Sequence, residues 1–157
     1  MRVFIADDSE MVCERLANLL APIEGVTIAG QAHDVPRAID LIRRLKPDAL
    51  ILDVQMPGGS GLDVLQEVKR DTPAPIVITI TNCPYPQYRK KYMEAGADYF
   101  FDKSMEFDKV ISVFNQLHCG KDAQYSEVES ELVESPVYRR MRGQKSLVSD
   151  RNNTLNQ

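Results

Sequence analysis

Cysteine is scarce in this sequence, and long hydrophobic runs are missing. The three cysteines, Cys13, Cys83 and Cys119, are odd in number and widely spaced, which favours neither a disulfide framework nor a zinc site and fits a reducing compartment. No apolar run approaches the roughly 18 residues that a membrane-spanning helix needs. The first residues enter an apolar segment directly, with no basic leader. We therefore expect a cytoplasmic protein with no membrane contact.

Concentrated positive charge is also absent. The 157 residues include 19 Lys and Arg and 23 Asp and Glu, for a formal net charge of −4. Residues 1–117 carry the whole acidic excess, with 13 basic and 17 acidic side chains, whereas residues 118–157 hold six of each. Non-specific nucleic-acid binding needs a concentrated basic surface, so we do not expect DNA binding. A hydrophobic content of 43% is enough for the core of one domain.

Residues 1–117 alternate between two periodicities. Buried-strand patterns are expected at residues 2–7, 26–32, 49–53, 75–81 and 99–101, and each precedes a segment with helical spacing of apolar residues. Five strand–helix units in a row predict an α/β fold with right-handed crossovers. We expect a doubly wound, five-stranded parallel sheet in the order 2-1-3-4-5, in a flavodoxin-like three-layer α/β/α arrangement.

Local signals mark the ends of the first two helices. Ser9 is expected to cap a helix that ends before Pro22, and Asp34 to cap a second helix with Pro36 in its first turn. The residues expected to face the core from the first helix are Val12, Leu16, Leu19 and Leu20.

Residues 118–157 differ from the rest of the chain. They are rich in Glu, Ser, Arg, Asn and Gln and have few large apolar side chains, so we expect a disordered tail. A capping box at 126–129 leaves open a short helix that forms on docking, with Tyr125, Val128 and Leu132 on one face. No pair of long amphipathic helices is visible there. We expect a stand-alone domain whose output is a contact with another protein.

Polar residues follow three of the predicted strands at the point where each strand ends. They are Asp7 and Asp8 after the first strand, Asp53 at the end of the third, and Lys103 after the fifth. Because the carboxyl ends of parallel strands share one edge of the sheet, three carboxylates and one ammonium converge there. Close carboxylates repel one another unless a cation lies among them. An all-oxygen set suits Mg²⁺, which leaves room for water and a phosphate, so the pattern predicts phosphoryl chemistry on an aspartate.

With two further features, these residues resemble the receiver domain of bacterial two-component response regulators. Asp53 opens an acid-x-x-Met-Pro-x-x-x-Gly loop that ends at Gly61. Thr81 closes the fourth predicted strand 28 residues after Asp53, and Lys103 follows 22 residues later. The segment 75–104 is most similar to receivers of the nitrate-response and nodulation-type regulators.

The resemblance implies a chemical role for each acidic residue. Asp53 is the phosphoacceptor, which takes a phosphoryl group from a sensor histidine kinase or a histidine phosphotransfer protein. Mg²⁺ is held by Asp7, Asp8 and Asp53, with the backbone carbonyl of Gln55. Lys103 pairs with Asp53 and afterwards with a phosphoryl oxygen.

The resemblance also implies a switch made of Thr81 and Phe100. Thr81 turns its hydroxyl onto the phosphoryl group, Phe100 rotates inward, and the face of the fourth helix, fifth strand and fifth helix changes shape. That face is expected to contact a downstream protein effector, and a homodimer through it is a further candidate. The chain departs from the family pattern at three positions. Ser104 stands where a proline is very often found, and Asn82 replaces a usually small residue. Phe100 stands where many relatives have a tyrosine or another aromatic residue; it can rotate inward but has no hydroxyl.

Simpler interpretations remain open for each residue. Asp7 or Asp8 could serve only as a helix cap, Thr81 only as a strand residue, and Lys103 only as a solvated lysine. Two other functions also remain open, which are a phosphate-independent adaptor and a Mg²⁺-dependent phosphatase. Beyond phosphorylation from small donors and hydrolysis of its own phosphoryl group, we expect no enzyme activity.

Overall fold

In the computed structural model, residues 1–118 are the described part of the chain. The expected disordered tail, and the alternative of a short helix with Tyr125, Val128 and Leu132, lie outside the described residues. Among residues 1–118, no helix is both long and apolar enough to cross a membrane.

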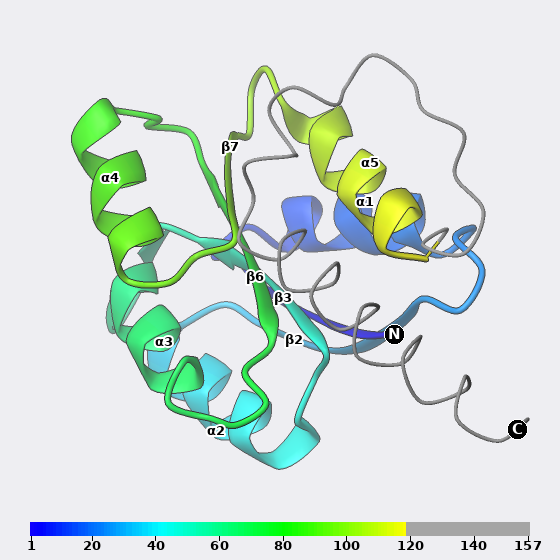
Figure 1. Cartoon of the computed structure of the whole chain (residues 1–157), viewed down its shortest axis with the longest axis horizontal. Helices are drawn as coiled ribbons and strands as arrows, with labels where there is room; N and C mark the ends of the chain where they lie inside the picture. The colour runs from blue at the N-terminus through cyan, green and yellow to red at the C-terminus, as the bar shows by residue number, and fades with distance from the viewer. Residues whose placement is uncertain (119–157) are drawn as a thin grey trace, which may run out of the picture. The chain divides into compact units, whose positions relative to one another are not determined.

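A single five-stranded parallel sheet forms the centre of the described domain (Figure 1). Its order is β2-β1-β3-β6-β7, which confirms the predicted 2-1-3-4-5 order because β6 and β7 are the fourth and fifth strands of this sheet. A small antiparallel pair, β4 and β5, lies in the loop after β3 and was not expected from the sequence. The strands are β1 Arg2–Ala6, β2 Thr27–Ala32, β3 Ala49–Asp53, β4 Gln55–Met56, β5 Gly59–Ser60, β6 Ile76–Thr81 and β7 Tyr99–Asp102.

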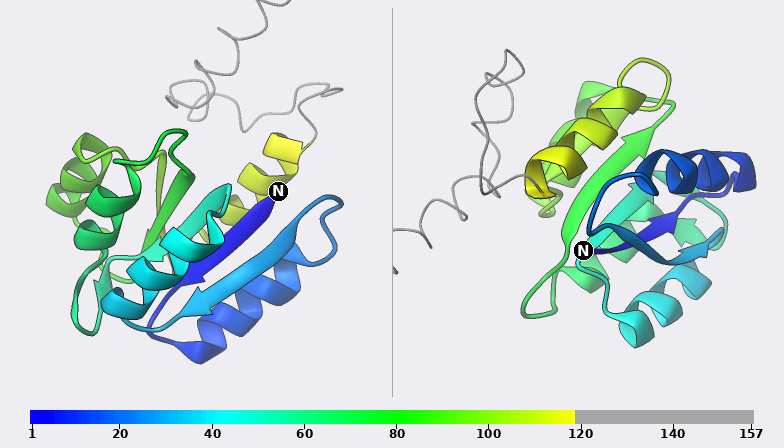
Figure 2. Two further views of the ribbon diagram at one scale, coloured as in Figure 1. Left: turned by 90° about the horizontal axis from the view of Figure 1, so that it is seen from below. Right: turned by 90° about the vertical axis from the view of Figure 1, so that its right-hand side faces the viewer.

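Helices cover both faces of the sheet (Figures 1 and 2). One face carries α1 and α5, which lie side by side, and the other carries α2, α3 and α4. The helices are α1 Glu10–Leu20, α2 Val35–Leu45, α3 Gly61–Val68, α4 Pro86–Glu94 and α5 Phe107–His118. This confirms the three-layer, doubly wound arrangement.

The strands are apolar on both sides because each face packs against helices. Successive side chains of a strand point to opposite faces, so Phe4 and Ala6 join the core beneath α2 and α3, together with Leu50 and Leu52. All five residues of β3 are buried, including Asp53 at its end. The central strand therefore leads directly from the core to the carboxyl edge of the sheet, where the strands end.

The predicted helix caps are confirmed. Ser9 Oγ accepts from the Val12 N–H at 3.4 Å, and Asp34 Oδ1 accepts from the Arg37 N–H at 2.8 Å. The expected inward face of α1 was partly wrong, because Leu19 is 38% exposed and Val12 is only partly buried. The buried residues of α1 are Cys13, Leu16 and Leu20.

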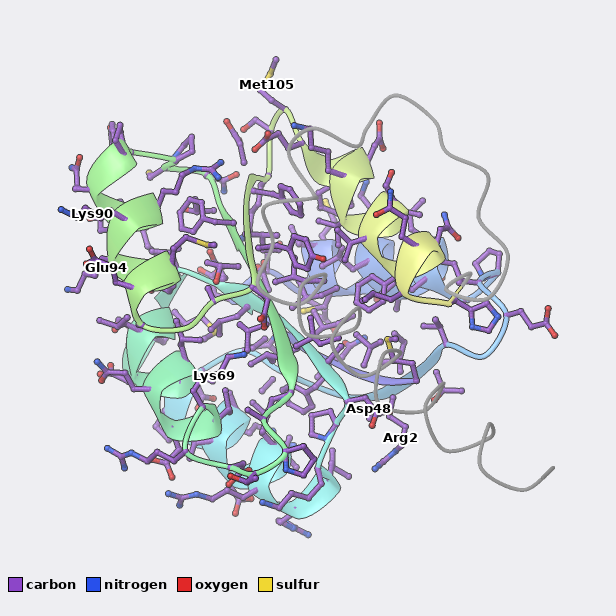
Figure 3. The ribbon with its side chains drawn as sticks, in the orientation of Figure 1. Arg2, Asp48, Lys69, Lys90, Glu94 and Met105 are labelled. Carbon is purple, nitrogen blue, oxygen red and sulfur yellow. The ribbon has the colours of Figure 1, made fainter. Side chains whose placement is uncertain are left out.

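A buried ion pair closes the amino edge of the sheet, where β6 and β7 begin. Lys69, just after α3 (Figure 3), lies 2.7 Å from Asp98 Oδ2 and also donates to the Pro75 carbonyl. The same Asp98 oxygen accepts from the Val77 N–H at 2.8 Å. The Asp98 side chain is only 4% exposed, so one carboxylate holds α3, β6 and the start of β7 together.

We predict that Asp98→Ala lowers the free energy of unfolding by about 3 kcal/mol. The substitution leaves the Lys69 ammonium and the Val77 N–H without their common acceptor in a mostly buried place. Asp40→Ala is the control, because its pair with Arg44 is exposed and should contribute less than about 0.5 kcal/mol. Urea unfolding of both variants measures the difference, and equal losses would contradict the prediction.

Candidate functional site

The sheet brings the three predicted carboxylates to one place at its carboxyl edge. β1 and β3 are neighbours, with Ala6 opposite Leu52, so the residues that follow, Asp7 and Asp53, are adjacent. One oxygen each of Asp7, Asp8 and Asp53 lies within 4.8 Å of the others. Asp7 and Asp53 are buried, whereas Asp8 is exposed.

The ammonium of Lys103 lies between the two buried carboxylates. Its Nζ is 2.6 Å from Asp7 Oδ2 and 3.1 Å from Asp53 Oδ2, and the side chain is only 7% exposed. Burial alone would lower the pKa of Lys103, but its hydrogen bond to Asp7 and the charges of both carboxylates raise that pKa above its usual value. Lys103 is therefore a buried cation in this structure and not a solvated loop lysine.

The loop that carries Lys103 is ordered without a proline. The Lys103–Ser104 peptide bond is trans, and Asp102 Oδ1 accepts from the Ser104 N–H at 2.7 Å. Glu106 closes the loop from the other side by accepting from the Asp102 N–H at 2.9 Å. With these bonds, the replacement of the family's proline by Ser104 does not keep Lys103 away from Asp53.

Negative charge at the site exceeds the positive charge facing it. Burial raises the pKa of Asp53 to about 6; the charge of Lys103 opposes this effect and the charge of Asp7 adds to it. Asp7 Oδ2 is buried, and its partner in the described structure is the Lys103 ammonium. Three carboxylates facing one ammonium form an oxygen donor set that fits a small divalent cation such as Mg²⁺.

The cap-only interpretation of the acidic pair does not fit this geometry. Ser9 caps α1, as described above, and Asp7 Oδ1 accepts from the Ser9 N–H at 3.0 Å while Oδ2 faces Lys103. Asp8 lines a cavity of about 400 Å³, together with Gln55 and residues of α4. The acidic pair thus faces the site, and Asp7 also helps to order the turn into α1.

Gly61 allows the following helix to begin against the acceptor loop. A Cβ at this position would lie 2.1 Å from the Asp53 carbonyl oxygen, so any larger residue would displace the backbone of the site. Gly58 and Gly59 adopt φ values of 81° and 152°, which side chains rarely allow. The glycines of the predicted loop therefore have a steric reason in the structure.

The two predicted switch residues lie on neighbouring strands. Thr81 is buried at the end of β6, and its Oγ1 accepts from the Cys83 N–H at 3.0 Å. Phe100 lies opposite Thr79 in β7 and is only 2% exposed. The Phe100 ring is already buried in this structure. The inward rotation on phosphorylation stays a prediction.

Two side chains that contact the Asp7 backbone were not predicted from the sequence. His33 Nδ1 lies 2.8 Å from the Asp7 carbonyl oxygen, and Cys13 Sγ lies 3.6 Å from the same oxygen. Burial raises the pKa of Cys13 to about 11, so its thiol stays protonated at neutral pH. His33 follows β2, the neighbour of β1, and the predicted strand order could have drawn attention to it.

We predict that Asp53→Asn stabilises the metal-free domain at about pH 7.5 by about 2–3 kcal/mol. The folded-state pKa of Asp53 is higher than its ordinary value of 3.8. The protonated acid therefore stabilises the fold fully below that value, and this contribution is lost as the pH rises through about 6. Asparagine does not ionise and avoids the loss. Urea unfolding in EDTA at about pH 7.5 and pH 4 should show most of the gain disappearing at the lower pH, and an equal gain at both would contradict this account.

Comparisons with known proteins agree with the fold and identify the family. A family model described as the response regulator receiver domain matches residues 3–115. Response regulator GacA of Pseudomonas aeruginosa is 31% identical over 121 residues, which cover 77% of this chain and 56% of GacA. The transcriptional regulatory protein YvfU of Bacillus subtilis is 34% identical over 121 residues, which cover 77% of this chain and 60% of that protein. The chain thus spans little more than half the length of these relatives.

Solved structures give the same result. The receiver domain of the response regulator NarL from Mycobacterium tuberculosis matches with a TM-score of 0.67 and 26% identity, covering 76% of this chain and 97% of that one. A CheX–CheY complex with BeF₃ and Mg²⁺ from Borrelia burgdorferi matches with a TM-score of 0.63 and 27% identity, covering 73% of this chain and 89% of that one. The chain therefore belongs to the family of response regulator receiver domains, the phosphorylation-activated switches of two-component signalling.

Proposed function

We propose that Asp53 is the phosphoacceptor of this receiver domain. The observation that carries the proposal is the position of the Lys103 ammonium, within 3.1 Å of an Asp53 oxygen and 2.6 Å of an Asp7 oxygen at a largely buried site. Phosphoryl transfer asks a protein mainly for positioning and charge neutralisation. A fixed lysine beside a carboxylate nucleophile provides both.

The proposed cofactor is Mg²⁺. Asp7, Asp8 and Asp53 would hold it, with the backbone carbonyl of Gln55 as the further ligand that the family implies. When bound, the ion neutralises the negative charge of the acidic cluster and of the transferred phosphoryl group. The related CheY complex contains Mg²⁺ with BeF₃, which supports the same assignment here.

The acceptor step forms one bond and breaks one. A carboxylate oxygen of Asp53 attacks the phosphorus of a phosphohistidine, the N–P bond breaks, and its electron pair remains on the imidazole nitrogen. Lys103 then pairs with one phosphoryl oxygen. Thr81 donates its hydroxyl hydrogen to another, because the hydroxyl oxygen already accepts from the Cys83 N–H. No turnover of an outside substrate is proposed beyond phosphorylation from small donors and hydrolysis of the aspartyl phosphate.

The phosphodonor is proposed to be a protein, either a sensor histidine kinase or a histidine phosphotransfer protein. Large apolar side chains are exposed on three loops or helix starts at the carboxyl edge of the sheet. Met11 is 79% exposed, Tyr85 56% and Met105 83%. Figure 3 shows Met105 projecting outward from the loop after β7. Exposed apolar side chains near the acceptor favour docking of a protein over capture of a small donor alone.

The output is proposed to pass through the face formed by α4, β7 and α5. Lys90 and Glu94 lie on the outer side of α4, with their charged groups 3.9 Å apart (Figure 3), and Arg89 is also exposed. A downstream protein effector or a second copy of the chain would meet these side chains.

We predict covalent, Mg²⁺-dependent phosphorylation of Asp53. After incubation with acetyl phosphate and Mg²⁺, intact mass should show one added phosphoryl group, and Asp53→Asn should abolish it. Asp8→Ala should slow the reaction strongly, because it removes the exposed member of the acidic cluster. Asp40→Asn, at an exposed and distant acid, is the control.

Two other outcomes of the same assay would replace the proposal. Turnover of an added phosphoester without a labelled protein would favour a phosphatase. Neither labelling nor turnover would favour a phosphate-independent adaptor.

We predict that Thr81→Ala accepts phosphate but transmits the signal poorly. The hydroxyl is needed to attract the phosphoryl oxygen, whereas the nucleophile belongs to Asp53. Intact mass should show labelling close to wild type, while phosphorylation-dependent NMR shifts of α4 amides should shrink. Shifts of wild-type size in the variant would remove Thr81 from the switch.

A further inference from the structure

Helix α4 places one fully buried side chain in the core, where Tyr88 and Met93 pack partly buried beside it. Tyr92 is the buried residue of α4 and is only 2% exposed, whereas the rest of the helix is exposed or partly buried. The helix begins after Tyr85 with no side-chain cap and has no acidic residue in its first turn. The helix start therefore has no side-chain cap or first-turn acid, and Pro86 is its favourable starting feature. Tyr92 is the most deeply buried contact of α4 with the domain.

Tyr92 contacts the acceptor loop directly. Its hydroxyl donates to the Val54 carbonyl oxygen at 3.3 Å, and Val54 is the residue after Asp53. Burial raises the pKa of Tyr92 above its usual value, so the phenol keeps its proton and remains a donor. The contact therefore joins the output helix to the backbone next to the phosphoacceptor.

A cavity separates the acceptor loop from the rest of α4. It has a volume of about 400 Å³ and is lined on one side by Val54, Gln55 and the β4–β5 pair, and on the other by Tyr88, Lys91 and Tyr92. The Tyr92 hydroxyl crosses this space and joins α4 to the loop at Val54, and the same hydroxyl has a further hydrogen bond with the Leu62 backbone at the start of α3.

Tyr92 is also linked to the residue in the family's switch position. Its ring meets the Phe100 ring edge-on, with centroids 5.9 Å apart and planes at 60°. The Arg89 guanidinium lies 5.3 Å from the centre of the same Phe100 ring. Two side chains of α4 therefore pack against Phe100, which is already buried. Phe100 has no hydroxyl that could form a hydrogen bond.

We propose that Tyr92 is the positioning residue that couples the Asp53 loop to α4. The inference rests on the proposed function of Asp53. A movement of the Val54 backbone on phosphorylation pulls or releases the Tyr92 hydroxyl, and the Tyr92 ring carries the change to Phe100 and to the outer face of α4. Phe100 has no hydroxyl, so the hydroxyl that bonds to the loop belongs instead to Tyr92. Tyr92 lies in α4, which is itself part of the proposed output face.

Tyr92→Phe tests this coupling because it removes the hydroxyl and keeps the ring that packs on Phe100. Tyr88→Phe is the matched control, since Tyr88 lines the same cavity but is only partly buried and has no hydrogen bond to the loop in the described structure. Each protein is treated with acetyl phosphate and Mg²⁺. Intact mass gives the labelled fraction, and backbone NMR gives the shifts of the Thr81 and Lys90 amides.

In Tyr92→Phe we expect wild-type labelling and a retained shift at Thr81. The shift at Lys90 should fall by about half or more, because loss of one hydrogen bond changes a two-state equilibrium several-fold. Tyr88→Phe should behave as wild type in all three measurements. Normal labelling with a full-sized Lys90 shift in Tyr92→Phe would overturn the coupling and leave the phosphoacceptor intact. Absence of labelling in the wild-type protein would instead overturn the proposed function and this inference with it.

Discussion

The buried ammonium of Lys103 between Asp7 and Asp53 is the interaction on which the rest of this domain depends. Two carboxylates at the ends of neighbouring strands would otherwise repel each other with little access to water. One lysine offsets part of that repulsion, while burial, with a smaller contribution from Asp7, still raises the pKa of Asp53 to about 6. The fold around them, from the close start of α3 at Gly61 to the closed loop before Glu106, holds these groups at hydrogen-bond distance.

The carboxylates at the two edges of the sheet differ in how fully the protein pairs them. At the amino edge, Asp98 is matched by Lys69 and by the Val77 N–H, so the carboxylate is satisfied within the protein. At the carboxyl edge, Asp7 Oδ2 has only an ion pair and Asp8 remains exposed. Under the proposed function, a site that binds a cation and a phosphoryl group needs such unbalanced charge, and the satisfied amino edge contributes stability that offsets its cost.

The strands and the acidic site could be predicted because both depend on local patterns: apolar runs, and polar residues where those runs end. The strand order followed from the doubly wound topology that successive strand–helix units favour. The phase of α1 could not, since Leu16 and Leu20 fit a stripe with Cys13 as well as one with Leu19, and only packing distinguishes them. The β4–β5 pair is too short to have a periodicity. Tyr92 was missed because its partner is a backbone carbonyl 38 residues away, which no side-chain pattern encodes.

Because Tyr92 is the one fully buried side chain of α4, a small change in free energy could shift the position of this helix. Segments that change position in signalling come from the less stable parts of a fold, and a helix with one buried side chain meets that condition. Thr81 ends β6, and the neighbouring strand β7 carries Phe100, which packs against Tyr92 of α4. A movement of Thr81 toward the phosphoryl group and a shift of the Val54 backbone would therefore both reach α4. Because Phe100 is already buried, the coupling does not require a ring to rotate; it requires only that the contact between Tyr92 and Val54 differ between the free and phosphorylated states.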